Sequence, residues 1–125
     1  MEGDAYWQLD DSGGEIASCC LSATLRDWGH FALFFLRGAR LPDRRAVMRE
    51  GWVQQATTTT REALDGLQGQ GGYGSQWWLT PGRAYRAAGI FGQGIWIDPQ
   101  IDLVVVTRSA WPGATDVPPR WRGRH

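Results

Sequence analysis

The run AAGIFGQGIWIDPQIDLVVVTRSAWP, residues 87–112, constrains the fold more than any other part of the chain. Its branched and aromatic residues are typical of strands, and Asp98 with Pro99 is typical of a tight turn between two of them. Glycines at 89, 92 and 94 interrupt the first of these strand-like parts. Because a glycine in a strand packs no side chain, it marks a bulge or a close approach by another backbone or a ligand. This run is therefore the first candidate site.

The remaining patterns predict helices before strands. TLRDWGHFALFFLRG, residues 24–38, offers Thr24 as an N-cap with Asp27 three residues later and ends at Gly38. A shorter helix, broken near Gly51, is expected from Pro42 through DRRAVMREGWVQQA, and TTTTREALDGL at 57–67 could add a further turn or two. Three strands are expected at 73–79, 87–97 and 102–110, forming an antiparallel meander whose central, doubly covered strand is 103–106. This order predicts an α+β fold.

Length and charge exclude several classes of protein. At 125 residues and 42% hydrophobic content, the chain can form one domain or part of one. Its 13 basic and 13 acidic residues balance, so no global field attracts nucleic acid or an anionic membrane. No apolar run approaches the length of a membrane span, and the acidic start MEGDAYWQLDD lacks a secretory signal, which predicts a cytoplasmic protein. Residues 116–125 are expected to form an irregular tail.

The chain lacks most of the residue types and spacings that metal sites, cofactor sites and covalent catalysis require. The chain contains no lysine and no asparagine, so it has no lysine for a Schiff base, a P-loop or a general base. Cys19 and Cys20 are sequence neighbours, which almost never pair with each other, and no second cluster completes a zinc site. They are interpreted as reduced thiols packed in a core, with a catalytic thiol as the second interpretation. His30 lies on the polar face of its helix and is interpreted as a surface histidine. Neither a metal nor a cofactor is expected.

The tryptophans are the second candidate feature. Eight of them indicate either a core built on indoles or a pocket lined with them. Trp77 and Trp78 are adjacent in an expected strand and must point to opposite faces, so at most one lines any given pocket.

Three segments together resemble a known family. GGEIASCCLSATLRDWGHFALFFLRG, YGSQWW and RAAGIFGQGIWIDPQIDLVVVTRSAWP are similar to the C-terminal part of the beta-lactamase-related serine hydrolases, in the branch with 6-aminohexanoate-dimer hydrolase and class C-like esterases. The resemblance covers about residues 1–115. It implies part of a beta-lactamase or transpeptidase-like fold, with one long helix, short helices and the three-stranded meander.

The resemblance also implies roles for the glycine-bearing run. Members of the family use a Ser-x-x-Lys nucleophile, a Tyr-x-Asn or Ser-x-Asn element, and a third element on the strand at the edge of the active site. Counting back from the Asp98-Pro99 turn, the third element falls on Ala87-Ala88-Gly89 and the backbone N–H of Ile90 becomes an oxyanion donor. The alternative register places it near Phe91-Gly92. The expected substrate-binding residues are Ala87, Ala88, Gly89, Phe91, Gly92, Trp77 and Trp78.

Departures from the family pattern shape the functional hypothesis. The third element of the family is Lys-Thr-Gly or His/Trp-x-Gly, so alanine at 87 replaces the usual cation or indole at its first position. A cation there helps bind a substrate carboxylate, as in penicillins, so esters and small amides are the expected substrates. The nucleophile and its lysine are absent here, so we expect a C-terminal segment whose partner is the missing N-terminal portion of the domain. Gly92 and Gly94 are expected to let neighbouring segments cross closely. Two other hypotheses stay open: a stand-alone tryptophan-rich ligand-binding module and a non-catalytic interaction protein.

We predict that this chain alone has no serine-hydrolase activity, because acyl transfer needs a hydroxyl activated by a base and the family's lysine is absent. A fluorophosphonate probe should leave the purified chain unlabelled, and turnover of a nitrophenyl ester should not exceed the uncatalysed rate. Stoichiometric labelling of one serine, with ester turnover abolished by its substitution, would contradict this prediction.

Overall fold

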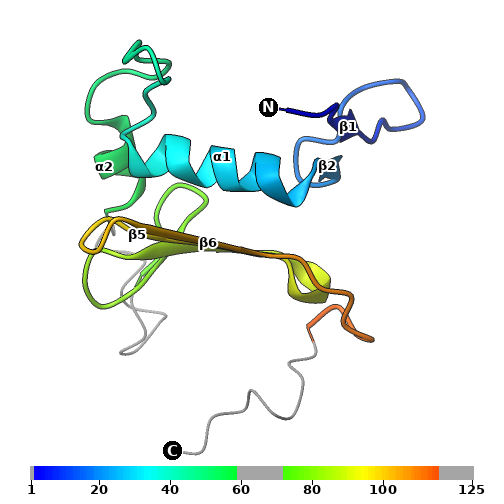
Figure 1. The fold of residues 1–125 in the computed structure, drawn as a ribbon. Coiled ribbons are helices and arrows are strands. Elements are labelled where there is room, and N and C mark those ends of the chain that lie inside the picture. Colours follow the sequence, from blue (N-terminus) through cyan, green and yellow to red (C-terminus); the bar gives the residue numbers. More distant parts are fainter. Residues whose placement is uncertain (1, 59–71, 116–125) are drawn as a thin grey trace, which may run out of the picture.

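The computed structural model describes residues 2–58 and 72–115 (Figure 1). The elements are β1 (Tyr6–Trp7), β2 (Leu21–Ser22), α1 (Leu25–Leu36), α2 (Trp52–Ala56), β3 (Trp78–Leu79), β4 (Tyr85–Ala88), the 3₁₀ turn η1 (Ile90–Gly92), β5 (Gly94–Asp98) and β6 (Leu103–Thr107). The predicted α+β class is confirmed. The helical turns expected at 59–67 and the tail at 116–125 lie outside the described residues. No helix in the described ranges is both long and apolar enough to cross a bilayer.

The main sheet has four antiparallel strands in the order β3-β4-β5-β6. One strand more than expected arises because the glycine-bearing run is not a single strand. Ala88 pairs with Gly94, so the chain reverses through η1 and continues as β5. The expected turn at Asp98 is present, with Asp98 paired to Leu103 and its carboxylate accepting the Gln100 N–H at 2.9 Å.

The prediction of 103–106 as a doubly covered central strand is wrong. β6 is the last strand of the described sheet, and α1 lies over only one of its faces (Figure 1). Val104 and Val106 face the helix, whereas Leu103 and Val105 are 42% and 43% exposed on the other face. A run of branched residues reports strand structure but not the number of covered faces.

Helix α1 is the best predicted element. The Thr24 hydroxyl accepts the Asp27 N–H at 3.1 Å and donates to the Asp27 carboxylate at 2.8 Å, which closes the first turn. At the other end, Gly38 has a φ of 70° and its N–H donates to the Phe35 carbonyl. Both predicted ends are confirmed.

The helix predicted to start at Pro42 is wrong in its first part. Residues 41–45 form a reverse turn in which the Leu41 N–H donates to the Arg45 carbonyl and Asp43 accepts the Arg45 N–H, both at 2.9 Å. Arg44 has a φ of 65°, which a helix does not allow. Proline is as suited to the second position of a turn as to the start of a helix, so the pattern was ambiguous. Only Trp52–Ala56 is helical.

A chain of aromatic rings joins α1 to the sheet. Phe35 packs on Trp77 with ring centroids 4.9 Å apart, and Trp77 packs on Tyr85 of β4 at 5.0 Å. All three side chains are buried, beside Ala32 and the fully buried Ile97. Burial raises the pKa of Tyr85 to about 12, so the phenol stays neutral. Among the described residues, Trp77 is the one tryptophan buried in the core, with Trp52 packed partly buried against it.

The N-terminal segment is fastened to the start of α1 by a buried carboxylate. Asp27 accepts the Glu2 N–H at 2.5 Å and the Gly3 N–H at 3.1 Å, and its side chain is almost wholly inaccessible. The Glu2 N–H, followed by the Thr24 hydroxyl and the Gly3 N–H, lowers the pKa of Asp27 because each bond favours the ionised form. The same segment continues into the two-stranded ribbon of β1 and β2.

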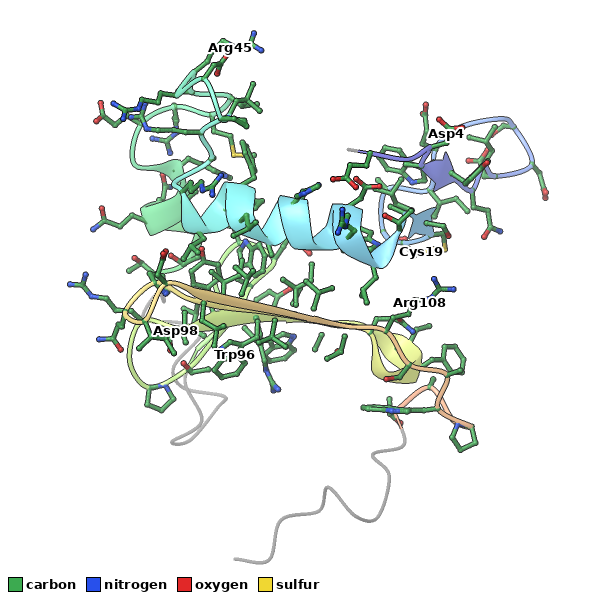
Figure 2. The ribbon with its side chains drawn as sticks, in the orientation of Figure 1. Asp4, Cys19, Arg45, Trp96, Asp98 and Arg108 are labelled. Atoms are coloured by element: carbon green, nitrogen blue, oxygen red, sulfur yellow. A yellow bond between two sulfur atoms is a disulfide. The ribbon has the colours of Figure 1, made fainter. Side chains whose placement is uncertain are left out.

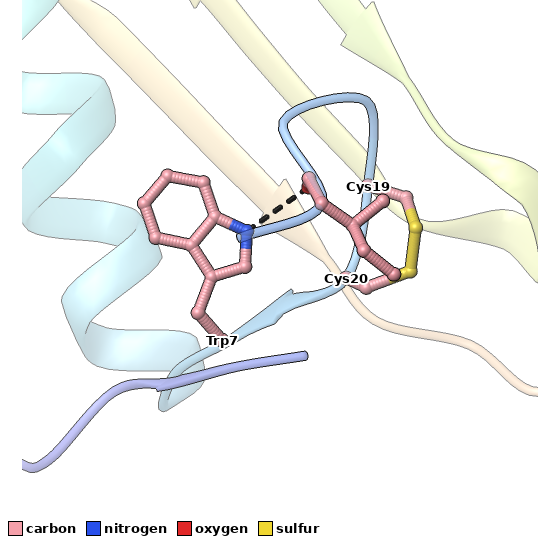
Figure 3. Close-up of a disulfide and its surroundings, with 4 residues drawn as sticks. Trp7, Cys19 and Cys20 are labelled. Carbon is pink, nitrogen blue, oxygen red and sulfur yellow. Dashed lines mark hydrogen bonds between the residues drawn. A yellow bond between two sulfur atoms is a disulfide. The ribbon is translucent and has the colours of Figure 1, made fainter. Parts of the chain in front are cut away.

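The interpretation of Cys19 and Cys20 as reduced thiols in a core is wrong. They form a disulfide with each other in the exposed turn before β2 (Figure 3). Cys20 has a φ of 75°, and its carbonyl accepts the Gln8 N–H at 3.1 Å. The Trp7 indole N–H donates to the Ile16 carbonyl of the same turn at 3.0 Å. The cysteines lie outside the core because the β1–β2 ribbon is located at the N-terminal end of α1 and not between the helix and the main sheet (Figure 1).

We predict that Asp27→Asn reduces stability at neutral pH and flattens its dependence on acid. A carboxylate whose folded pKa is lowered contributes stability that is fully present above the unfolded pKa and lost as pH falls through the folded value. Urea unfolding at pH 7 and at decreasing pH should show the wild-type free energy of unfolding falling toward that of the variant. Exposed Asp11→Asn is the matched control. Parallel pH profiles for wild type and Asp27→Asn would contradict the assignment.

Candidate functional site

The candidate site lies where β4 continues beyond its short neighbour. β3 pairs only with Tyr85 and Arg86, so the same edge of β4 has no partner strand at residues 87–90 within the described chain. On the other edge, the Gly89 N–H donates to the Gln93 carbonyl at 2.9 Å. Backbone groups alternate between the two edges of a strand, so the N–H and carbonyl of Ala88 point to the unpaired edge.

The amide of Ile90 is the available donor at this edge. Within residues 2–58 and 72–115, its N–H has no hydrogen-bond acceptor, and its side chain is 60% exposed. The next amide differs, because the Phe91 N–H donates to the Ala114 carbonyl at 2.8 Å. Gln93 braces the reversal through its side chain, which donates to the Ser109 carbonyl at 2.7 Å. The edge therefore presents two N–H groups and one carbonyl, from Ala88 and Ile90.

The glycines allow segments to cross closely around this edge, as predicted. Gly92 has a φ of 83°, and a Cβ there would overlap the Trp111 ring. A Cβ on Gly94 would press on the Thr107 hydroxyl, and one on Gly89 would lie 3.1 Å from the Gln93 Cβ. The segment after β6 folds back over η1, where the Trp111 N–H donates to the Phe91 carbonyl at 3.2 Å. The glycines thus allow the chain to reverse between β4 and β5, and they allow the segment after β6 to pack closely on η1.

Two cavities meet at residues 88 and 89, one on each face of the sheet. The helix-side cavity, about 930 Å³, lies between α1 and the sheet and is mostly apolar. The indole pocket, about 370 Å³, lies on the opposite face, between Trp78, Arg86 and Trp111. Figure 2 shows Trp96, the neighbour of Arg86 on β5, on that same side, away from α1. Ala88 and Gly89 line both cavities.

The structure separates the predicted site residues between these cavities. Trp77 and Ala87 line the helix-side cavity, whereas Trp78 and Ile90 line the indole pocket. Trp77 is 5% exposed and Trp78 is 39% exposed, which confirms that the pair points to opposite faces.

The remaining two predicted residues, Phe91 and Gly92, line neither cavity and instead hold the returning segment. Sequence reasoning missed Arg86 and Trp111. The period-two alternation of a strand could have indicated Arg86, because it lies directly across from Trp78.

Charged groups elsewhere make local contacts. His30 is exposed, as predicted, with its ring nitrogens 3.7 Å from the Glu2 and Asp27 carboxylates. In the described part of the chain, no three His, Cys, Asp or Glu side chains gather in a way that could hold a metal ion.

A family model and a curated protein both match this chain in sequence. A family model described as Beta-lactamase matches residues 3–124. The chain is also 34% identical over 117 residues to 6-aminohexanoate-dimer hydrolase of Paenarthrobacter ureafaciens. That alignment covers 87% of this chain and 30% of the relative, so the chain spans less than a third of the relative's length.

We predict that Gly92→Ala destabilises the protein more than Gly38→Ala does. Both glycines have positive φ, at 83° and 70°, so each alanine incurs a backbone cost of about 1–2 kcal/mol. Only at Gly92 does the new methyl group also overlap an indole, because nothing lies within 4 Å of a Cβ on Gly38. Urea unfolding measures both losses, and hydrogen exchange at the Phe91 and Trp111 amides should rise in the first variant alone. Equal losses of stability would contradict the close Trp111 contact.

Proposed function

Because the chain belongs to the beta-lactamase family, we propose that it supplies the active-site edge strand of a serine hydrolase acting on esters or small amides. The reaction proceeds through an acyl-enzyme. The serine nucleophile and its base come from the part of the domain that precedes this sequence, since a chain without lysine has no Ser-x-x-Lys.

The observation that carries this proposal is the Ile90 amide at the unpaired edge of β4. An oxyanion hole needs an N–H that is aimed at the reacting carbonyl and has no competing acceptor. Within the described chain the Ile90 N–H meets the second condition, because it has no hydrogen-bond acceptor there. A substrate lying along this edge would place its carbonyl oxygen at that donor.

The backbone contacts favour this register over the alternative near Phe91-Gly92. The Phe91 N–H already donates to the Ala114 carbonyl, and the turn around Gly92 is covered by Trp111. A donor engaged at 2.8 Å would have to break that bond before it could stabilise an oxyanion.

The side chains around the edge favour a substrate other than a beta-lactam. Ala87, at the first position of the third element, provides no cation for a penicillin carboxylate. The relative from Paenarthrobacter is by its name a hydrolase of the 6-aminohexanoate dimer. These two observations support esters and small amides as the substrate class.

The helix-side cavity supports a partner in the preceding part of the domain. Its walls include Leu25, Trp28 and Phe31 of α1, with Leu25 46% and Phe31 39% exposed. On the sheet side, Ala87, Gly89 and Gly94 leave room for a closely packed element. An apolar hollow of about 930 Å³ next to the proposed donor would hold the element that carries the nucleophile.

The test is to extend the reading frame upstream of codon 1 and to express the complete protein. A Ser-x-x-Lys segment in that frame, labelling of its serine by a fluorophosphonate, and ester or amide turnover would support the proposal. An upstream frame without such a segment, or a complete protein that does not react with the probe, would overturn it. In that case the stand-alone ligand-binding module or a non-catalytic interaction protein would take its place.

We predict that Ile90→Pro lowers kcat of the complete protein about a hundred- to thousandfold, the usual effect of removing one oxyanion donor. Proline deletes the N–H, and Gly89, with φ −104° and ψ 163°, already has the extended backbone that a residue before proline adopts. Ile90→Ala is the matched control, because it keeps the N–H and should change kcat only a few-fold. Similar kcat values for the two variants would show that Ile90 is not the donor.

A further inference from the structure

The disulfide between Cys19 and Cys20 contributes little to global stability, because it joins residues that are adjacent in sequence. A disulfide stabilises a fold mainly by restricting the unfolded chain, and this restriction grows with the length of the loop that the bond closes. Here that loop is the shortest that a chain can form. The bond acts instead on the local backbone, since it closes a small ring that includes the peptide bond between the two cysteines.

That ring holds Cys20 in a backbone conformation that a residue with a β-carbon disfavours. Cys20 has a φ of 75°, in the left-handed region. In this conformation its carbonyl accepts the Gln8 N–H at 3.1 Å, which joins the residue after β1 to the residue before β2. The Cys19 N–H donates to the Ile16 carbonyl at 3.3 Å in the same turn. The closed form of the turn therefore depends on the ring.

Both cysteines are also accessible to a reagent in solution. They are exposed, in the turn that precedes β2 (Figure 3). Exposed disulfides are the ones that an incoming thiolate can attack, whereas buried disulfides resist exchange. The turn also contains a reporter, because the Trp7 indole N–H donates to the Ile16 carbonyl at 3.0 Å.

We propose that Cys19 and Cys20 are a site of reversible thiol–disulfide exchange, and that their redox state sets the conformation of the turn between β1 and β2. A thiolate of an external dithiol attacks one Sγ, the Sγ–Sγ bond breaks, and a mixed disulfide forms. The second thiol of the reductant then attacks this mixed disulfide and forms the reductant's own disulfide. An electron pair and two protons are thereby transferred to the two cysteines, and the oxidised dithiol closes the bond by the reverse steps.

Opening the ring changes the turn and, with it, one wall of the helix-side cavity. Without the ring, Cys20 leaves the left-handed region and the Gln8 N–H loses its acceptor. Ala17 and Ser18 of the same turn line the helix-side cavity together with Ala88 and Gly89. A redox change at the cysteines therefore alters the side of the cavity that faces the edge of β4. The inference concerns the turn itself and does not depend on the proposed hydrolase function.

The experiment compares the full wild-type chain in its oxidised form and after reduction by dithiothreitol without denaturant. Mass spectrometry after alkylation measures the fraction of reduced cysteines, and NMR follows the Gln8 amide and the Trp7 indole N–H. Both signals should shift in step with reduction, and hydrogen exchange at Gln8 should rise about two- to tenfold, the effect of losing one hydrogen bond. The Gln100 amide, which donates to Asp98 in the distant β5–β6 turn, should not change. The urea midpoints of the two forms should be similar.

Three outcomes of this comparison would overturn the proposal. The first is an oxidised chain without a Cys19–Cys20 disulfide, and the second is a disulfide that dithiothreitol reduces only in denaturant. The third is reduction that leaves the Gln8 and Trp7 signals in place. A large fall in the urea midpoint on reduction would also contradict it, because the bond would then stabilise the whole fold.

Two double variants provide the matched test of the backbone argument. Cys19→Ser with Cys20→Ser should give the spectrum of the reduced chain whether or not dithiothreitol is present. Cys19→Ser with Cys20→Gly should keep the Gln8 and Trp7 signals close to those of the oxidised chain, because glycine adopts a φ of 75° without the cost of a β-carbon. Identical spectra for the two double variants would show that the disulfide does not act through the conformation of Cys20.

Discussion

The contact of Phe35 with Trp77, and of Trp77 with Tyr85, is the interaction on which the rest of the structure depends. It is the place where α1 and the sheet become one core, because the three rings come from α1, from the residue just before β3, and from β4. Because Trp77 is buried in this core and successive side chains of a strand alternate, Trp78 points to the other face of the sheet. The two-cavity arrangement follows, with an apolar hollow under the helix and an arginine between indoles on the far side.

The elements that could be predicted from sequence contain capping or turn residues that are compatible with only one local conformation. Thr24 and Asp27 cap each other, and Gly38 ends the helix, so the limits of α1 follow from the chain itself. Asp98 and Pro99 likewise specify a turn. Pro42 carries no such unique signal, since proline favours both a turn and a helix start, and the tertiary setting selected the turn.

Other features depend on tertiary contacts that the hydrophobic periodicity of the sequence does not indicate. The reversal between β4 and β5 uses glycines that were interpreted as interruptions of one strand, although their positions around residues 89–94 were the right place to look. Among residues 2–58 and 72–115, the edge at Ala88 and Ile90 has no partner strand because β3 is short, and strand length is set by its neighbours. The register that points to Ile90 came from family resemblance, whereas Arg86 and Trp111 needed the folded sheet and the returning segment.

The strand pairing of this sheet has a consequence for the order of folding. Within the meander, paired residues are close in sequence: Asp98 meets Leu103, Ala88 meets Gly94, and the ends of β5 and β6 meet through Gly94 and Thr107. The contact of Phe35 with Trp77, in contrast, closes a long loop, and loop closure must occur before such a contact can stabilise anything. The meander is the part of low contact order, so β4, β5 and β6 are expected to assemble first and to form the template on which α1 later docks.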